Sequence, residues 1–374
     1  MDNSCLIGFD ASVIRGRRTG VENYAFRLLE ALRQLPDAPR IAAFSNQPVE
    51  GVPEIIVKSA PLPLAAWRQL ILPGLARQAG VTSFHSPVTA IPLILTVPVV
   101  ATLHDAGFFT VPACYRLRER LSQSFWLRAA LARAAAAVCV SETTKAHIAA
   151  RFPNATGRMH AVLSGALAMP SPQSAPPAAL PGIHQPFALC VGRLERRKNP
   201  VRTLEAFLTA TAAPEFRNYT LVFAGQPGNA AGDLAAAIAR HPEAAGRVMV
   251  LEYVTADTLA GLYRAADLLL YLSLDEGFGH PPFEALAAGT PVVAADIPVL
   301  REILADAATF APPEDIPAMA AAIRRLIAEP ALRKAQLAAG QQRLAARSWQ
   351  QTASKIVALH RSLTKNGGAN SARF

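Results

Sequence analysis

Short apolar runs rich in β-branched residues alternate along the chain with longer amphipathic stretches. Parallel strands that are buried on both faces have such continuous apolar runs, and helices join them. In the first half, the pattern predicts strands at Cys5–Phe9, Ile41–Phe44, Ile55–Val57, Ser83–His85, Val99–Leu103 and Ala137–Val140. In the second half, it predicts strands at Phe187–Val191, Tyr219–Ala224, Val248–Leu251, Leu268–Tyr271, Pro291–Ala294 and Thr309–Ala311. The predicted fold class is therefore α/β, with doubly wound parallel sheets.

The helices expected between these strands divide into two sets. The first set is Val21–Gln34, Trp67–Ala79, Tyr115–Ala135 and Ser141–Arg151. The second set is Pro200–Ala212, Leu234–Arg240, Asp257–Ala265, Pro282–Ala288, Ile297–Ala305, Ile316–Glu329, Ala331–Ala346 and Trp349–Leu363. The segment between the sets reads MPSPQSAPPAALPGIHQP, and its prolines exclude a helix or a central strand. We therefore predict two Rossmann-sized domains, 1–168 and 186–345, joined by a linker at 169–185, with a last helix within 346–363 and a disordered tail at 364–374.

Composition agrees with a large folded protein, because 51% of the 374 residues are apolar and 17% are charged. The cysteines, Cys5, Cys114, Cys139 and Cys190, lie far apart, so neither a disulfide framework nor a zinc site is expected. No apolar run is long enough to span a bilayer, and the first residues lack the pattern of a secretory signal. We expect a cytoplasmic protein.

The stretch with the most candidate site residues is SLDEGFGHPPFEALAAGTPVVA, which begins at Ser273 directly after a predicted strand. It places Glu276 in a strand-to-helix loop and Glu284 in the first turn of the next helix. Gly277 and Gly279 have no Cβ, so the backbone there can approach a ligand closely, and the helix N-terminus attracts an anion. A carboxylate such as Glu284 can accept two hydrogen bonds from a vicinal diol. By themselves, two glutamates eight residues apart indicate no function, because Glu284 can simply complement the helix dipole and the glycines can simply turn the chain.

The complete string EGFGHPPFEALAAGTPVV resembles the E-x7-E signature of retaining GT-B glycosyltransferases of the GT4 type, also called glycosyltransferase group 1. The resemblance implies that Glu276 orients the donor sugar and that Glu284 binds the ribose hydroxyls. It also implies that the backbone of Gly277–Gly279, which includes Phe278, follows the sugar and phosphate. In such a fold two Rossmann-like domains face each other across a cleft, and the helix at 346–363 returns to the first domain.

A cationic loop follows the first strand of the second half and reads VGRLERRKNP. It resembles the G-R-x-x-x-x-K-N/G segment of the same family, which implies that Arg193 and Lys198 bind the leaving diphosphate. We expect Arg196 and Arg197 to be solvated loop charges. Asn199 suits an N-cap, followed by Pro200 in the first helical turn.

Further candidates rest on shorter matches to the family. Gly20 lies in TGVENY, which resembles the family's opening before the first helix, and we expect it near the donor phosphates. His104 ends a strand and begins an H-D pair, so we expect it to contact donor sugar or acceptor. His85 lies in an F-H-x-P segment, where a structural role is as plausible as a site role. Tyr253 and Val254 resemble the segment whose backbone contacts the nucleotide base.

Together these matches imply an enzyme that transfers a hexose with retention from a nucleotide sugar to a glycan acceptor. They look most like bacterial mannosyltransferases that build surface polysaccharide or lipopolysaccharide, so we expect GDP-mannose as donor and a lipid-linked acceptor. A UDP-hexose is the alternative donor. No Asp-x-Asp motif is present, so no metal or other cofactor is expected. The remaining alternatives are an epimerase or phosphorylase of the same fold, and a non-catalytic protein that binds sugar nucleotides or nucleic acid.

The net charge of +10 is uneven, because residues 1–169 hold 17 basic and 10 acidic residues whereas residues 170–374 hold 20 and 17. Part of the excess lies in the stretch 115–133, which reads YRLRERLSQSFWLRAALAR. A basic amphipathic helix suits an anionic membrane surface, and an ordinary helix with one core face is the alternative. No homeodomain, RRM, KH or zinc module is recognisable, so a nucleic-acid partner is not expected.

Overall fold

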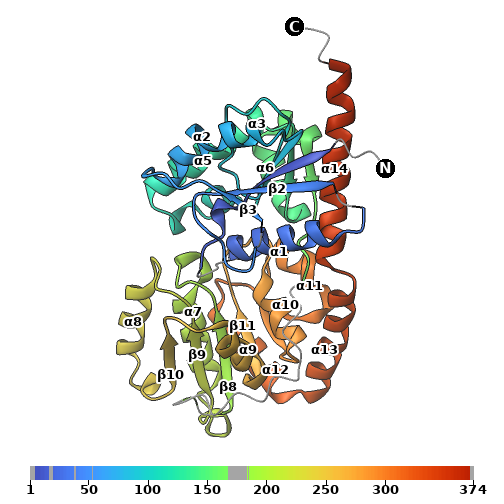
Figure 1. Cartoon of the computed structure of the whole chain (residues 1–374). Helices are drawn as coiled ribbons and strands as arrows, with labels where there is room; N and C mark the ends of the chain where they lie inside the picture. The colour runs from blue at the N-terminus through green and yellow to red at the C-terminus, as the bar shows by residue number, and fades with distance from the viewer. Residues whose placement is uncertain are drawn as a thin grey trace. The chain divides into compact units, whose positions relative to one another are not determined.

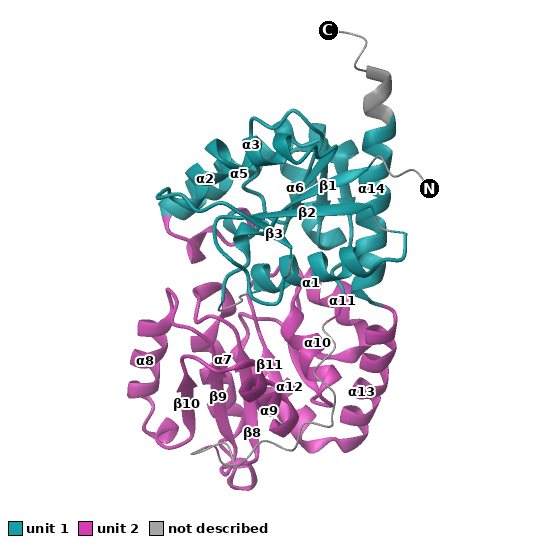
Figure 2. Ribbon diagram, in the orientation of Figure 1, with its two compact units in different colours: residues 1–108, 117–165, 347–374 teal, residues 109–116, 166–346 magenta. Residues whose placement is uncertain are grey.

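The computed structural model describes residues 5–16, 20–37, 39–52, 54–166, 183 and 185–370, with side chains as far as residue 365. The chain forms two compact units, coloured separately in Figure 2. Unit 1 comprises residues 1–108, 117–165 and 347–374, and unit 2 comprises residues 109–116 and 166–346. Most of the predicted linker, 169–182 and 184, lies outside the described residues.

Unit 1 is built on a parallel sheet with the strand order β3-β2-β1-β4-β5-β6-β7 (Figure 1). Its strands are β1 (Leu6–Asp10), β2 (Arg40–Ser45), β3 (Ile55–Val57), β4 (Ser83–Ser86), β5 (Val99–Leu103), β6 (Ala136–Cys139) and β7 (Met159–Ala161). Its helices are α1 (Gly20–Gln34), α2 (Leu64–Leu70), α3 (Leu72–Gln78), α5 (Leu117–Arg133), α6 (Glu142–Arg151) and α14 (Trp349–Asn370); α4 (Gly107–Thr110) lies at the border with unit 2. The strand order reverses at β1 and β4, where the carboxyl ends of such sheets leave room for a ligand.

Unit 2 repeats this architecture with the parallel strand order β10-β9-β8-β11-β12-β13. Its strands are β8 (Phe187–Val191), β9 (Thr220–Ala224), β10 (Val248–Leu251), β11 (Leu268–Tyr271), β12 (Val292–Ala295) and β13 (Thr309–Ala311). Its helices are α7 (Pro200–Ala210), α8 (Ala231–Arg240), α9 (Ala256–Ala265), α10 (His280–Ala287), α11 (Pro298–Leu304), α12 (Ile316–Ala328) and α13 (Pro330–Ala345). Here the order reverses at β8 and β11.

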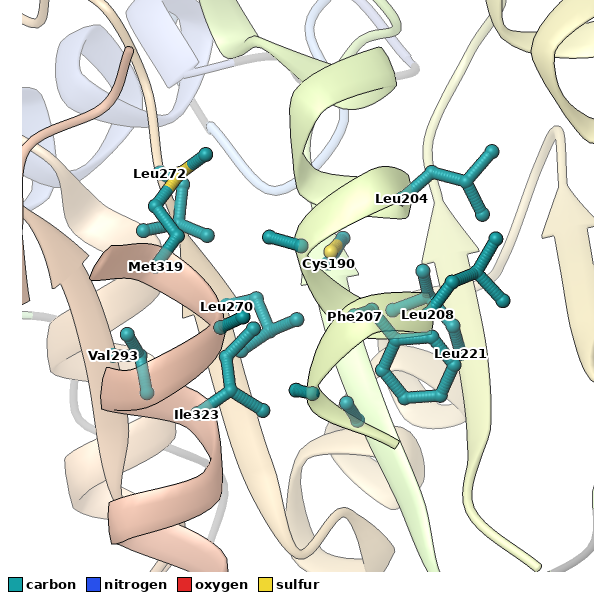
Figure 3. Close-up of a cluster of buried hydrophobic side chains, with 14 of the residues drawn as sticks. Cys190, Leu204, Phe207, Leu208, Leu221, Leu270, Leu272, Val293, Met319 and Ile323 are labelled. Atoms are coloured by element: carbon teal, nitrogen blue, oxygen red, sulfur yellow. The ribbon is translucent and has the colours of Figure 1, made fainter. Parts of the chain in front are cut away.

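A core of apolar side chains holds helices against the sheet of unit 2, as Figure 3 shows. Ile323 from α12 lies beside Leu270 from β11, Phe207 from α7 lies beside Leu221 from β9, and every second strand residue points to this face. The intervening residues, such as Leu269, are equally buried because helices also cover the other face. This burial on both faces explains why the strands have unbroken apolar runs.

The α/β prediction is confirmed, and six strands have the predicted bounds: β3, β5, β8, β10, β11 and β13. The single helix expected at Trp67–Ala79 is wrong, because α2 ends before Ile71 and α3 begins at Leu72. Pro73 stands in the first turn of α3, where its missing N–H costs no hydrogen bond. The short strand β7 was not predicted.

Two boundaries also differ from the prediction. Residues 109–116, which we expected in the first domain, belong to unit 2, where the Asn229 amide donates a hydrogen bond to the Cys114 carbonyl at 2.8 Å. At the other end, α14 continues to Asn370, past residue 363 where we expected a tail to begin, and 371–374 lie outside the described residues. No helix among the described residues is long and apolar enough to cross a bilayer.

The start of α14 packs closely against the chain at Gly165 in unit 1. A Cβ built on Gly165 would stand 2.6 Å from the Trp349 backbone nitrogen, a distance that real Cβ atoms do not show. The Thr352 hydroxyl donates to the Leu163 carbonyl at 2.8 Å, and α14 packs along α1. Glycine at position 165 therefore permits the close approach of α14.

We predict that Gly165→Ala lowers the free energy of unfolding of unit 1 by about 1–3 kcal/mol, because the added methyl group must displace backbone atoms. Urea-induced unfolding, followed by tryptophan fluorescence, measures this change. Gly157→Ala is the matched control, because a Cβ on Gly157 meets nothing within 4 Å. Equal stability of the two variants would contradict the assigned packing.

Candidate functional site

One buried carboxylate in unit 2 binds two cationic side chains. Glu276 lies in the loop between β11 and α10 and is 7% exposed. Its Oε1 accepts a bond from Lys198 Nζ at 2.6 Å, and its Oε2 accepts one from Arg197 Nη1 at 2.8 Å. A buried carboxylate is stable only when it is paired in this way. Because Glu276 contributes one negative charge and Lys198 and Arg197 contribute two positive charges, the three side chains together carry a net charge of +1.

The sheet topology brings these side chains together. Arg197 and Lys198 lie in a short 3-10 turn, η4 (Arg196–Lys198), that follows β8, whereas Glu276 follows β11. Because β8 and β11 are neighbours at the reversal of strand order, their carboxyl ends meet at one edge of the sheet. Residues almost eighty positions apart in sequence thus form one cluster.

Asn199 fixes the end of this turn. Its φ of 59° lies in the left-handed region, which asparagine tolerates better than most residues. It occupies the predicted N-cap position of α7, but its side chain makes no capping bond. The amide instead donates to the Leu272 carbonyl at 3.0 Å and to the Pro313 carbonyl at 2.7 Å. The side chain therefore links η4 to the end of β11.

The expectation that Arg197 is a solvated loop charge is wrong. Its side chain is 14% exposed and also donates to the Asp275 carbonyl at 2.7 Å. Arg196 does meet the expectation of a surface charge, because it is largely exposed and pairs with Asp233 on α8 at 3.0 Å. The turn directs one of two neighbouring arginines inward and the other outward.

Electrostatics keep Glu276 ionised. Burial alone would raise its pKa, but the charges of Lys198 and Arg197 lower it to about 2. Burial lowers the pKa of Lys198, and the Glu276 charge opposes that shift. The Lys198 ammonium also bonds the Tyr271 hydroxyl at 3.0 Å, and burial raises the Tyr271 pKa well above its ordinary value. Tyr271 therefore remains a neutral partner of the ion pair.

A pocket opens beside Lys198, and its lining includes Gly192, Arg193, Tyr271 and Ser273. Arg193 is mostly exposed and donates from Nε to the Pro227 carbonyl at 3.1 Å. Gly192 has a φ of 138°, which favours glycine, and a Cβ there would contact the Lys198 side chain. The structure thus places Arg193 and Lys198 at one pocket, and their binding of a diphosphate stays a prediction.

The loop after Glu276 leads into α10 through Gly279, whose φ of 104° favours glycine. Phe278 is buried and stacks on Phe283, and His280 packs beside Phe278 with ring centroids 5.0 Å apart. Glu284, on α10, accepts a bond from the Tyr263 hydroxyl at 2.6 Å. Burial raises the Glu284 pKa, and this hydrogen bond partly opposes the shift.

The remaining candidate in unit 2 is the base-contacting segment Tyr253–Val254. It lies in the loop between β10, at the edge of the sheet, and α9. The Tyr253 side chain is exposed, which leaves its ring accessible from solvent. Its role, like those of Gly277, Phe278 and Gly279, stays a prediction.

The candidates of unit 1 lie in different environments. Gly20 is the first residue of α1, and a Cβ there would meet nothing within 4 Å. His104 follows β5, where one ring nitrogen lies 2.8 Å from the Pro87 carbonyl and Tyr24 packs edge-on against the ring. His85 is fully buried in β4 and lies 3.3 Å from a ring nitrogen of His360 on α14. The structure therefore favours the structural role for His85.

Two family models match the chain, one to each half. The model described as "Glycosyltransferase Family 4" matches residues 18–165, and the model described as "Glycosyl transferases group 1" matches residues 181–343. The chain belongs to the group 1, family 4 glycosyltransferases.

Relatives and solved structures agree with this assignment. The glycosyltransferase is 27% identical over 382 residues to O-antigen chain mannosyltransferase B of Escherichia coli, covering 93% of this chain and 97% of the relative. It is 33% identical over 125 residues to the serotype-specific mannosyltransferase WbdA of Escherichia coli, covering 33% of this chain and 15% of WbdA.

Among solved structures, sucrose-phosphate synthase from Thermosynechococcus elongatus has a TM-score of 0.77 at 21% identity, covering 97% of this chain and 100% of that chain. Anabaena HepE in complex with UDP and glucose has a TM-score of 0.72 at 18% identity, covering 96% and 100%. These likenesses confirm the predicted GT-B fold of the glycosyltransferase.

Sequence reasoning missed three contributors to these clusters. Arg197 adjoins Lys198, Tyr271 is the last residue of the strand before the Glu276 loop, and Tyr263 lies on the helix before that strand. The position of Tyr271 at a strand end was a readable signal. Nothing in the sequence alone pairs Tyr263 with Glu284.

Three histidines of unit 1, the fully buried His85 and His360 and the partly buried His104, predict sensitivity to acid. Burial lowers the pKa values of His85 and His104, and that of His360 to about 3, so all three are neutral in the folded glycosyltransferase. Unfolded histidine binds a proton near pH 6.5, so below that pH the unfolded state holds more protons. Stability is therefore retained above about pH 6.5 and lost as the pH falls toward 3, by up to about 1.4 kcal/mol per pH unit and histidine.

Urea unfolding at a series of pH values below neutrality measures this slope. His360→Gln should make the slope shallower, because one buried neutral histidine is removed. His241→Gln is the control, since His241 is partly exposed on unit 2 and pairs with Glu243. An unchanged slope in His360→Gln would contradict the assignment.

Proposed function

We propose that this glycosyltransferase transfers mannose from GDP-mannose to a lipid-linked glycan, with retention of configuration, in the synthesis of O-antigen or a similar surface polysaccharide. The single observation that carries the proposal is the Glu276 cluster beside the Lys198 pocket, because it joins a sugar-orienting carboxylate to a cation suited to a diphosphate. The mannosyltransferase names of the relatives support mannose as the sugar.

The donor would be held mainly through its charged and diol groups. Arg193 and Lys198 would neutralise the diphosphate as it leaves, so the reaction needs no metal ion in this proposal. Glu284, fixed by Tyr263, would accept hydrogen bonds from the ribose hydroxyls. A UDP-sugar remains the second candidate donor, because the structurally similar HepE was solved with UDP and glucose.

The chemistry would depend on positioning and on stabilising the leaving group. Glu276 is an ionised carboxylate already engaged by two cations, so we propose that it orients the sugar hydroxyls instead of acting as a general acid. A front-face displacement would retain configuration, with the leaving phosphate accepting the proton of the attacking hydroxyl. The C1–O bond to the acceptor forms as the C1–O bond to the diphosphate breaks.

We further propose that unit 1 docks on an anionic membrane through α5. Leu117, Leu121 and Phe125 recur every fourth residue of α5 and are 67%, 62% and 57% exposed. Arg118 and Arg120 are exposed beside them. An apolar stripe flanked by arginines fits acyl chains bordered by anionic headgroups, and it would bring a lipid-linked acceptor near the enzyme.

A thermal-shift panel of GDP, UDP, ADP and dTDP with their sugars tests the donor. We predict that GDP and GDP-mannose raise Tm, since a ligand at about 100 times its Kd adds about 2.7 kcal/mol to the folded state. Lys198→Met should remove most of that shift and lower turnover about 100- to 1,000-fold, because it removes a charge that stabilises the leaving group. A chelator should leave wild-type turnover unchanged.

The possible outcomes separate the parts of the proposal. Stabilisation by UDP and not by GDP would replace GDP-mannose with a UDP-sugar and leave the transfer reaction standing. No response to any nucleotide would contradict the proposed reaction itself.

Cosedimentation with vesicles tests the α5 surface. We predict that the protein binds phosphatidylglycerol-containing vesicles and not phosphatidylcholine vesicles, and that salt weakens binding by screening the arginines. The variant Leu121→Glu/Phe125→Glu should release the protein while its nucleotide binding stays at the wild-type level. Val250→Glu, at an exposed apolar position on unit 2, is the matched control. Equal sedimentation of both variants would contradict the proposed surface.

A further inference from the structure

We infer that Arg197 is the positioning residue that holds Glu276 in place and balances its charge, so that Lys198 can move from Glu276 to the donor diphosphate. This inference rests on the proposed function and extends it to a residue whose role neither the family models nor the names of the relatives assign. The evidence for this inference is that Arg197 and Lys198, which are neighbours in η4, are held in different ways.

Arg197 is fixed to the Glu276 loop at three consecutive residues. The Leu274 N–H donates to the Arg197 carbonyl at 2.8 Å. The guanidinium Nη1 donates to the Asp275 carbonyl at 2.7 Å and to Glu276 Oε2 at 2.8 Å. A planar guanidinium with several bonds to one loop holds that loop in one geometry. We therefore expect Arg197 to remain bound to Glu276 when a diphosphate binds.

Lys198 is held in a way that permits it to move. Its ammonium lines the pocket that Arg193 also lines, and its bonds to Glu276 Oε1 and the Tyr271 hydroxyl come from one compact charge on a flexible stem. A diphosphate entering this pocket can attract that ammonium away from Glu276. The carboxylate would then keep Arg197 as its counter-ion and remain ionised for the sugar.

Charge balance gives Arg197 a second effect. With Arg197 present, Glu276 and the two cations sum to one positive charge. A further carboxylate, that of Glu195, lies 3.7 Å from Arg197 Nη2 and is partly exposed, so it offsets this charge only weakly. Without Arg197, Lys198 and Glu276 would form a neutral pair, and the pocket would keep only the positive charge of Arg193, which is mostly exposed and lies 3.8 Å from Glu195. Arg197 thus sets diphosphate affinity without contacting the diphosphate.

The test measures the Kd of GDP, by calorimetry, and the turnover of GDP-mannose in the full-length protein. We predict that Arg197→Met weakens GDP binding by about 10- to 100-fold, the range expected when one charge-assisted interaction is lost. Arg196→Met is the matched control in the same turn, because Arg196 is exposed and pairs with Asp233, and it should bind GDP like the wild type. Arg197→Lys should restore GDP affinity but not full turnover, because lysine supplies the charge without the rigid planar guanidinium whose Nη1 bonds both the Asp275 carbonyl and Glu276.

The deciding measurement is the GDP affinity of the double variant Arg197→Met/Glu276→Gln. Removing the carboxylate charge frees Lys198 again, so the double variant should bind GDP almost as tightly as the wild type although it turns over poorly. If Arg197 served only to keep the fold, Glu276→Gln would not restore affinity. Circular dichroism establishes that each variant is folded, and Arg197→Lys keeps the test decisive if Arg197→Met does not fold.

The results distinguish this inference from the proposed function. If the wild type binds neither GDP nor UDP, both fall together. If the wild type binds UDP only, the same variants are compared with UDP. If the wild type binds and transfers normally, but Arg197→Met equals Arg196→Met or is not rescued by Glu276→Gln, the role of Arg197 alone is overturned.

Discussion

The arrangement of unit 2 depends on one constraint, which is that a buried carboxylate must be paired with positive charge. Glu276 meets it through two cations from one short turn, and this pairing requires β8 and β11 to be neighbours. The left-handed conformation at Asn199 ends the turn that presents both side chains, and its amide fastens the turn to β11. The strand order and the left-handed backbone at Asn199 thus both serve to place the two cations against the buried carboxylate.

Unit 1 also buries an ion pair, between Arg68 and Asp10 at 2.7 Å, and in addition it buries neutral histidines. His360 lies between His85 and Ser83, at 3.3 Å and 2.9 Å, so α14 is bound to the sheet through hydrogen bonds as well as apolar contacts. A buried imidazole satisfied on both nitrogens specifies one position of the helix. Both units therefore pair a buried carboxylate with positive charge, and unit 1 also uses neutral histidines to fix α14 against its sheet.

Much of this was predictable from sequence because strands buried on both faces leave unbroken apolar runs, as Val99–Leu103 and Phe187–Val191 show. The Glu276 and Lys198 motifs were also readable, because the strings around them resemble the family's E-x7-E and G-R-x-x-x-x-K-N/G segments. The inward turn of Arg197 was not readable, because adjacent arginines look alike until the 3-10 turn assigns them to different sides. The partner of His85 lies 275 residues further along the chain, where no local pattern reveals it.

The assignment of residues 109–116 to unit 2 and of α14 to unit 1 makes the polypeptide cross between the units four times. Neither unit is therefore a continuous stretch of sequence. A fragment ending at the proline-rich segment would lack the helix that covers Gly165, and the complementary fragment would lack the peptide that satisfies Asn229. Dissection of this enzyme into separately produced halves would expose surfaces that the intact chain covers, so the covalent order of the chain makes the two units dependent on each other for folding.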